Sequence, residues 1–160
     1  MEMYLCYEDN KVYTLSETNF VVYNVTKHQK IMDLNIKGGT AFDRIPLSDV
    51  ICLGLERSIV IRKNAQFMTK FELKGMPECI IYMNNYFIVG GDFDHIMLIN
   101  IPMGMRIFNI PIEVSGISLI KGDGINHITF STYCGLIGHG DIRLSQHPIF
   151  VLLIQAFLPD

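Results

Sequence analysis

The sequence has 160 residues, which is long enough for one domain with a buried core. Hydrophobic residues make up 49% and charged residues 18%, and no apolar run reaches the ~20 residues that span a bilayer. The net charge is −3 and the basic residues are scattered singly, so these features exclude a transmembrane helix and argue against nucleic acid as a direct ligand.

The N-terminal residues, MEMYLCYEDN, are acidic where a secretory signal peptide is basic, and they lack a long apolar segment. We therefore expect an intracellular protein, cytoplasmic or nuclear. The high apolar content also predicts more apolar surface than a free monomer tolerates, which indicates a protein partner.

Short runs rich in Val, Ile, Tyr, Phe and Thr follow one another along the chain, and Asn, Asp, Gly and Pro separate them. The first group of residues favours strands and the second favours turns. Their near-regular spacing predicts an all-β sandwich, barrel or propeller with little helix. The expected antiparallel strands lie within 3–16, 20–36, 50–61, 66–73, 79–101, 106–112 and 117–133.

The C-terminal segment 149–158 is apolar on all sides, so it fits a buried strand or a helix that begins at Pro148. A strand that is apolar on both faces has to be covered on both faces. We expect this cover to come from residues 3–7 of the same chain or from another subunit.

The chain matches itself in pattern when it is shifted by 76 residues, because residues 3–36 then lie on 79–112 without a gap. A second shift of 37 places Lys37-Gly38 on Lys74-Gly75, which implies a repeat of about 38 residues. This length is typical of a four-stranded propeller blade. The repeat predicts a single domain, 1–160, with blade-like units at about 3–38, 39–75, 76–112 and 113–158. The first strand of the unit 39–75 is expected to be less regular and to contain Pro46.

Residues 78–110 show one unit in full, with strands separated by Asn84-Asn85, by the acidic turn 92–94 and by the turn 102–105. This order resembles a blade of the WD-repeat propeller family, and residues 3–36 resemble a second blade. The resemblance implies about four four-stranded antiparallel blades in a partial or small β-propeller. Such a protein is either a closed four-bladed ring or an open arc that a partner completes.

The chain departs from the WD-repeat pattern at the signature residues. It contains no Trp, so the Trp-Asp pair is absent, and Asn24 and Asn100 stand where the Asp would be. Lys37-Gly38 and Lys74-Gly75 lie near the place of the Gly-His pair. The hydrogen-bond network that these signatures form in the family is therefore not transferred to this chain.

The segment Asp92-Phe-Asp94-His95 places two carboxylates and an imidazole close together. These are metal-ligand types, but an acidic turn in which Asp side chains bind backbone amides explains them better. Further along, Gly138-His-Gly-Asp141 lies near Cys134 and His147 without zinc-site spacing. We interpret Gly138–Asp141 as a glycine-rich turn before Ile142.

Two other glycine pairs, Gly122-Asp-Gly124 and Gly38-Gly39, match no phosphate-binding loop and are interpreted as tight turns. The four cysteines are far apart in the sequence, so we expect buried free thiols rather than disulfides or a zinc site. They are Cys6, Cys52, Cys79 and Cys134. No catalytic, cofactor-binding or metal-binding residue is assigned, and no cofactor is expected.

These features predict a non-enzymatic protein–protein interaction module, acting as a scaffold or subunit of a larger intracellular assembly. The expected partners are other protein subunits or further copies of the chain, because unpaired blade edges invite pairing. One alternative is a structural or viral β-sandwich protein, which would have no four-strand repeat of about 38 residues. A second alternative is a small propeller enzyme whose site is not visible in the sequence.

Overall fold

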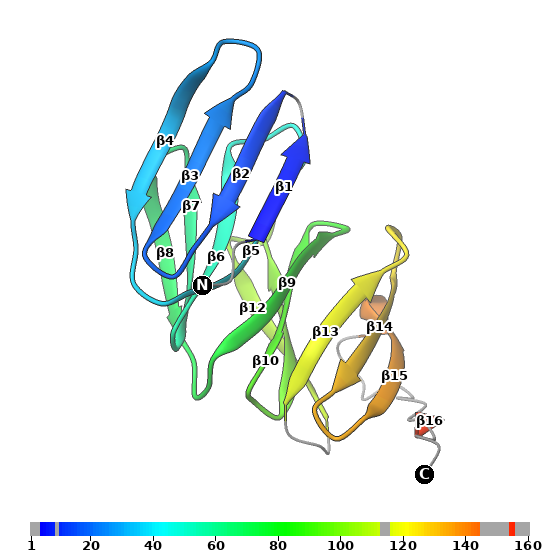
Figure 1. The fold of residues 1–160 in the computed structure, drawn as a ribbon. Coiled ribbons are helices and arrows are strands. Elements are labelled where there is room, and N and C mark those ends of the chain that lie inside the picture. Colours follow the sequence, from blue (N-terminus) through cyan, green and yellow to red (C-terminus); the bar gives the residue numbers. More distant parts are fainter. Residues whose placement is uncertain (1–3, 9, 113–115, 145–153, 156–160) are drawn as a thin grey trace. The chain divides into compact units, whose positions relative to one another are not determined.

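A computed structural model of the chain describes residues 4–8, 10–112, 116–144 and 154–155. Within these ranges every regular element is a β-strand, apart from a single 3-10 turn at Ile142–Leu144. The strands form four sheets of four, and each sheet is built from strands that follow one another in sequence (Figure 1). The all-β fold of four-stranded antiparallel sheets predicted from the sequence is confirmed.

The first sheet contains β1 (Tyr4–Glu8), β2 (Lys11–Leu15), β3 (Asn19–Asn24) and β4 (Gln29–Asn35). The second sheet contains β5 (Gly39–Arg44), β6 (Val50–Leu55), β7 (Ser58–Lys63) and β8 (Gln66–Glu72). The third sheet contains β9 (Pro77–Met83), β10 (Tyr86–Gly91), β11 (His95–Asn100) and β12 (Arg106–Pro111). The fourth sheet contains β13 (Ile117–Gly122), β14 (His127–Thr132), β15 (Leu136–Asp141) and β16 (Ile154–Gln155).

The chain divides into two compact units, Met1–Pro77 and Glu78–Asp160. The first unit holds the first two sheets, and the second unit holds nearly all of the third and the fourth. The expectation that residues 1–160 act as one domain stays a prediction.

The core of the first unit follows from strand alternation. Tyr13 pairs with Val22 and Leu15 pairs with Phe20 across β2 and β3, so all four side chains lie on one face. Leu15 and Phe20 are fully buried, and Leu53 of the second sheet joins the same apolar cluster. The two sheets of this unit therefore share a core.

The core of the second unit is made largely of isoleucine. It includes Ile88 of β10, Ile117 and Ile120 of β13, and Phe130 of β14, each at most 2% exposed. Gly90 lets these sheets approach, because a Cβ at this position would lie 2.7 Å from the Ile117 side chain. A glycine inside a strand commonly marks such a close approach.

The Asn84-Asn85 pair closes the hairpin between β9 and β10. Both residues have positive φ, 47° and 68°, as the two central residues of a type I′ turn require. Asn tolerates this left-handed region better than most residues. The turn predicted at these two positions is confirmed.

The unit 39–75 was expected to begin with a less regular strand that contains Pro46. The structure has this first strand as β5, Gly39–Arg44, which ends before Pro46. Its residues include Gly39, Ala41 and Asp43, which have low strand propensity, and its register with β6 shifts between Gly39 and Ala41. Pairing with β6 holds the segment in the sheet despite its composition.

Strand β15 corrects a second expectation, since Gly138–Asp141 belongs to a strand and not to a turn. Gly138 lies opposite Phe130 of β14, and a Cβ at residue 138 would lie 2.1 Å from the Phe130 ring. The glycine therefore makes room for a large side chain on the neighbouring strand.

The apolar segment 149–158 falls mostly outside the described residues. Only Ile154–Gln155 is described, as the short strand β16, which pairs with Leu136 and Ile137 of β15. The expected burial of the segment stays a prediction.

Candidate functional site

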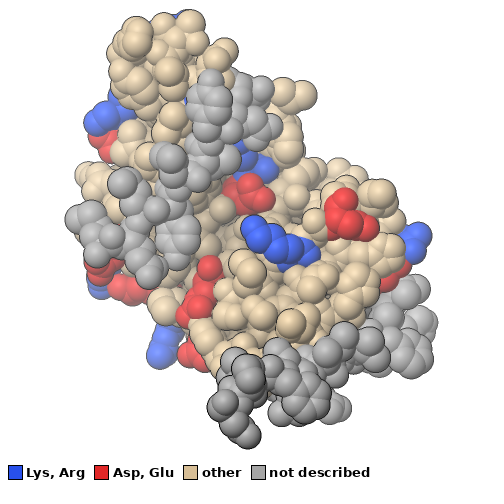
Figure 2. All heavy atoms as spheres, turned by 45° about the vertical axis from the view of Figure 1, so that its right-hand side comes forward, with Lys and Arg blue, Asp and Glu red and all other residues tan. Residues whose placement is uncertain are grey.

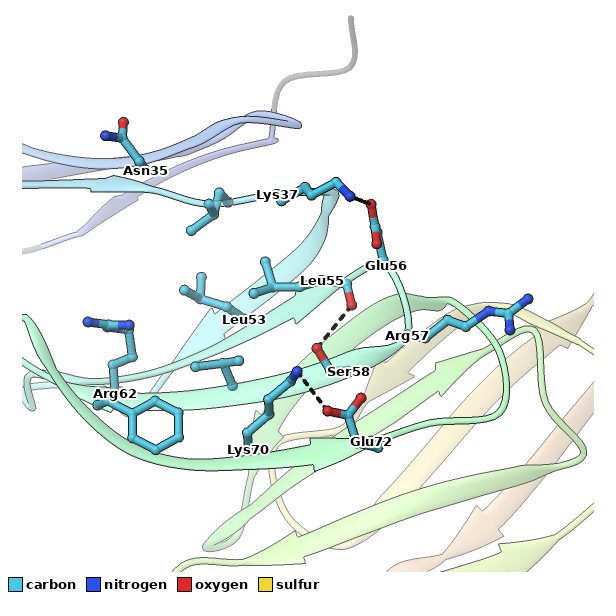
Figure 3. A pocket seen from close by; sticks show the side chains of 13 residues that line it. Asn35, Lys37, Leu53, Leu55, Glu56, Arg57, Ser58, Arg62, Lys70 and Glu72 are labelled. Atoms are coloured by element: carbon cyan, nitrogen blue, oxygen red, sulfur yellow. Dashed lines mark hydrogen bonds and ion pairs between the residues drawn. The ribbon is translucent and has the colours of Figure 1, made fainter.

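A groove with a volume of about 420 Å³ lies over one face of the second sheet, beside the connection from β4 to β5 (Figure 3). Side chains of β6, β7 and β8 line it, together with Asn35, Ile36 and Lys37 from the connection. All of these residues belong to the first compact unit.

The strand register fixes which side chains share this face. Three rows run across β6, β7 and β8: Leu55–Ser58–Glu72, Leu53–Val60–Lys70, and Arg62 beside Phe67 on the last two strands. Ser58, Val60 and Arg62 alternate along β7, so they point to the same side of the sheet. The groove thus has an apolar floor that ends at an arginine.

Ion pairs lie at the edge of this floor. Lys37 Nζ lies 3.5 Å from Glu56 Oε1, and Lys70 Nζ lies 2.7 Å from Glu72 Oε1. These side chains are largely exposed, and such pairs contribute at most about 1 kcal/mol to stability. Because of these pairs, both carboxylates of the groove, Glu56 and Glu72, already have a cationic partner.

Two further cations line the groove, and neither has a carboxylate within ion-pair distance in the described part of the chain. Arg57 is exposed at the turn between β6 and β7. Arg62 donates from Nη2 to the Ala65 carbonyl oxygen at 2.5 Å, while its Nε is buried without a hydrogen-bond partner. A buried donor that lacks an acceptor costs free energy, so this arginine would favour an incoming oxygen.

A second polar cluster lies on the fourth sheet, around the turn that joins β13 to β14. Asp123 Oδ1 accepts hydrogen bonds from the backbone N–H groups of Ile125, Asn126 and His127 at 2.8–3.0 Å. Its Oδ2 lies 2.8 Å from His127 Nδ1. These hydrogen bonds, with that of the Ile125 amide the largest contributor, hold the pKa of Asp123 well below its usual range.

Asp141 lies on the other side of His127. His127 Nε2 is 3.7 Å from Asp141 Oδ2, and the guanidinium of Arg143 forms a two-point contact with the Asp141 carboxylate. The hydrogen bond from Arg143 is the main reason why the pKa of Asp141 falls to about 2. The His139 ring stacks on that of His127, with centroids 5.5 Å apart.

This second cluster comes from one sheet, and each of its carboxylates is already occupied by backbone amides, an imidazole or a guanidinium. Across the described residues, no group of three or more His, Cys, Asp or Glu side chains is arranged to hold a metal ion. What the cluster does here is fix turns: Asp123 fixes the turn after β13, and Asp141 fixes the backbone N–H of Arg143 at 2.9 Å. His147 lies outside the described residues.

Asn24 and Asn100 end the third strand of their sheets, and Asp141 ends the third strand of the fourth sheet. Asn24 Oδ1 accepts from the Lys27 N–H at 2.7 Å, and Asn100 Oδ1 accepts from the Met103 N–H at 2.9 Å. The residues at the WD-repeat Asp position therefore act as turn caps here. The two asparagines were predicted at this position from the sequence, whereas Asp141 was not.

The segment Asp92–His95 forms the predicted turn between β10 and β11, with Phe93 buried and its N–H donating to the Gly91 carbonyl oxygen. Asp94 Oδ1 lies 2.9 Å from His95 Nδ1. The acidic turn is confirmed, and one contact of Asp94 in it is to the imidazole of His95.

The remaining predicted features are turns and thiols. Gly124 and Gly38 have positive φ at turns, as expected, whereas Gly122 ends β13 and Gly39 begins β5. Cys52 and Cys79 are free and buried, and burial raises the pKa of both thiols, that of Cys79 to about 12. Cys134 is exposed at the turn after β14, so the expectation that it is buried was wrong. The side chain of Cys6 lies outside the described residues.

The groove residues Val60, Arg62 and Phe67 were not predicted from the sequence. The alternation Ser58, Val60, Arg62 was visible and predicts one shared face. The pairing of Arg62 with Phe67 depends on a register shift after Ile61, which the sequence does not reveal.

The charged residues outside these sites are mixed in sign. On the face shown in Figure 2, Lys and Arg side chains lie beside Asp and Glu side chains in small groups. No helix among the described residues is long and apolar enough to cross a membrane.

Comparison with known proteins identifies a family and several structures of similar fold. The family model of the WD40-like domain matches residues 3–150. No protein of curated function matches the sequence. The computationally designed Ika8 protein is 16% identical, with a TM-score of 0.75 over 88% of this chain and 46% of that one.

Two further structures extend this comparison. U3-55K is 8% identical, with a TM-score of 0.72 over 84% of this chain and 43% of that one. The designed Ika4 protein is 12% identical, with a TM-score of 0.76 over 86% of this chain and 89% of that one. The chain thus spans less than half the length of Ika8 and U3-55K. At these identities the likeness shows the fold alone.

Proposed function

The chain belongs to the WD40-like domain family, and we propose on this basis that it is a non-enzymatic protein-interaction module, a scaffold or subunit of a larger intracellular assembly. The resemblance to WD-repeat blades in the sequence and the four propeller-like sheets agree with this family. Function on such a fold depends on the surface that each member presents.

One observation carries the proposal: the groove of the second sheet presents an apolar floor together with two arginines, Arg57 and Arg62, that have no carboxylate partner among the described residues. Val60 and Leu53 are buried in the floor, while Phe67 at its edge is 58% exposed. An aromatic side chain beside an arginine is a frequent composition of protein interfaces. The expected partners are therefore other protein subunits, with further copies of the chain as the second possibility.

The two alternative functions fit the structure less well. A β-sandwich does not consist of four successive four-stranded units, and all four sheets are built in this way. A propeller enzyme would bring acidic or His side chains together from several blades. The cluster around His127 draws all of its members from the fourth sheet and its flanking residues, and its carboxylates are occupied.

The test is to fractionate native extract by size and follow the chain with an antibody. We expect it to elute well above its own mass of 18.2 kDa, with defined proteins that mass spectrometry identifies in constant ratio. Those proteins should rebuild the same complex when they are purified separately and mixed with the chain. Elution as a lone monomer in native extract would overturn the proposal.

A further inference from the structure

We propose that the groove on the second sheet binds a short extended peptide segment of a partner protein, which carries two apolar side chains and one carboxylate at alternate positions. This inference rests on the proposed function and names the chemistry of the partner. It follows from the size, spacing and charge of the groove.

The groove has room for a few side chains of a bound segment. Its volume is about 420 Å³, and one turn of an α-helix, with a diameter of about 10 Å and a pitch of 5.4 Å, fills roughly 400 Å³. A longer helix or a folded element would extend far beyond the lining residues. A few side chains of an extended segment fit this space.

The spacing of the rows matches an extended chain. Ser58, Val60 and Arg62 are alternate residues of β7, so their rows repeat about every 6.6 Å. Alternate side chains of an extended peptide have the same repeat. Two apolar side chains of the peptide therefore meet the rows of Ser58 and Val60, and the next side chain on that face meets Arg62.

The charge of the groove selects an acidic side chain for this third position. Glu56 and Glu72 are held by Lys37 and Lys70, so, among the residues that the structure describes, Arg57 and Arg62 leave the groove with two cations in excess. Arg62 stands at the end of the apolar floor, with Nε buried and without an acceptor. A carboxylate oxygen that accepts from this group, after a small shift of the side chain, removes the cost of the unsatisfied donor.

Phe67 completes the site from the neighbouring strand. It pairs with Arg62 across β7 and β8 and remains 58% exposed, although its ring lines the groove. A bound apolar side chain would remove part of this ring from water, which contributes to affinity in proportion to the area buried.

The test uses fluorescein-labelled peptides and the 160-residue chain, with binding followed by fluorescence anisotropy. The two probes are Ser-Leu-Ser-Leu-Ser-Glu-Ser and its reverse, since the groove does not fix the direction of the peptide. Glutamine analogues of both probes serve as controls. We expect saturable binding of at least one probe, with a Kd below about 1 mM, and at least roughly tenfold weaker binding of its glutamine analogue.

Matched protein variants locate the binding. Arg62→Gln should weaken binding of the glutamate probe roughly tenfold and leave binding of the glutamine analogue nearly unchanged. Lys63→Gln removes the same charge from the next residue, which lies on the opposite face, and should have little effect. Phe67→Ser should weaken both probes about fivefold, whereas Met68→Ser, at an adjacent exposed residue outside the groove, should not.

Three outcomes would overturn the inference. The first is the absence of probe binding by the folded chain, as judged by its thermal melt. The second is equal affinity of the chain for the glutamate and glutamine probes, or equal affinity of the Arg62→Gln and Lys63→Gln variants for the glutamate probe. The third is a doubled mass in light scattering that Phe67→Ser returns to the monomer, because the groove would then hold a second copy of the chain.

The effect of the two variants on the native complex distinguishes a failure of this inference from a failure of the proposed function. If a complex forms and survives both Arg62→Gln and Phe67→Ser, the interaction module stands and the peptide groove is wrong. If no complex exists in native extract, the proposed function itself fails.

Discussion

The groove of the second sheet and the His127 cluster of the fourth sheet contain similar numbers of charged groups, yet they differ in what those groups still lack. Around His127, each carboxylate already accepts from backbone amides, an imidazole or a guanidinium. In the groove, Arg62 keeps a buried donor without an acceptor beside apolar side chains. The comparison shows that a concentration of ionisable residues marks a site less well than unsatisfied groups beside an apolar surface.

The largest expected effect is on the free energy of unfolding, which should fall much more for a substitution in the inner floor of the groove than for one at its outer edge. Leu53→Ala removes a side chain that is 1% exposed and belongs to the core of the first unit. We expect it to lower the free energy of unfolding by about 3 kcal/mol. Phe67→Ala, at 58% exposure, should change it by less than about 0.5 kcal/mol. Urea unfolding measures both, and equal losses would show that Phe67 is structural.

A somewhat smaller effect is expected at the strand that carries His139 and Asp141. Gly138→Ala places a Cβ 2.1 Å from the Phe130 ring and should cost about 2 kcal/mol of unfolding free energy. Gly140→Ala is the matched control, because its nearest neighbour would lie 4.0 Å away, and it should cost less than about 0.5 kcal/mol. Thermal unfolding of the two variants tests the difference, and a neutral Gly138→Ala would contradict the packing described for β15.

Asn24 and Asn100, which cap the turns after β3 and β11, offer a third test. Asn100 is 6% exposed, and Asn100→Ala leaves the Met103 N–H without its acceptor, so we expect a loss of about 1 kcal/mol. Asn24→Ala removes the same bond from a more exposed turn and should cost about 0.5 kcal/mol. Chemical denaturation resolves these values. A larger loss at Asn24 would argue against burial as the cause.

The smallest effect concerns acid stability. The pKa of Asp141 is depressed to about 2, so its ionised form stabilises the folded chain above its ordinary pKa near 4. This contribution should disappear as the pH falls from about 4 to about 2. The difference in melting temperature between the unaltered chain and Asp141→Asn should therefore shrink across this range.

Glu17→Gln is the control for the acid series, because Glu17 is exposed at the turn between β2 and β3. Its difference from the unaltered chain should stay small at every pH. If Asp141→Asn weakened peptide binding, the contrast between the groove and the His127 cluster would be wrong, because the cluster would then have a role in recognition.

Sequence reasoning was most successful where strong turn signals separate the strands. The third sheet was predicted to within one or two residues at each strand, because its strands are separated by strong turn signals such as Asn84-Asn85. It misplaced β5 and failed at β15, where glycines occupy strand positions and tertiary packing overrides local propensity. The groove was out of reach for a related reason: it depends on the register of three strands and on a shift after Ile61.

The contact between Phe130 and Gly138 has a consequence for how this sequence can change over time. The two residues divide a single volume between neighbouring strands, so neither can be replaced independently. A larger residue at 138 becomes tolerable only after the ring at 130 has been exchanged for a smaller side chain. The two positions should therefore vary together among descendants of this chain, and the order of the two substitutions should be fixed, with 130 changing first.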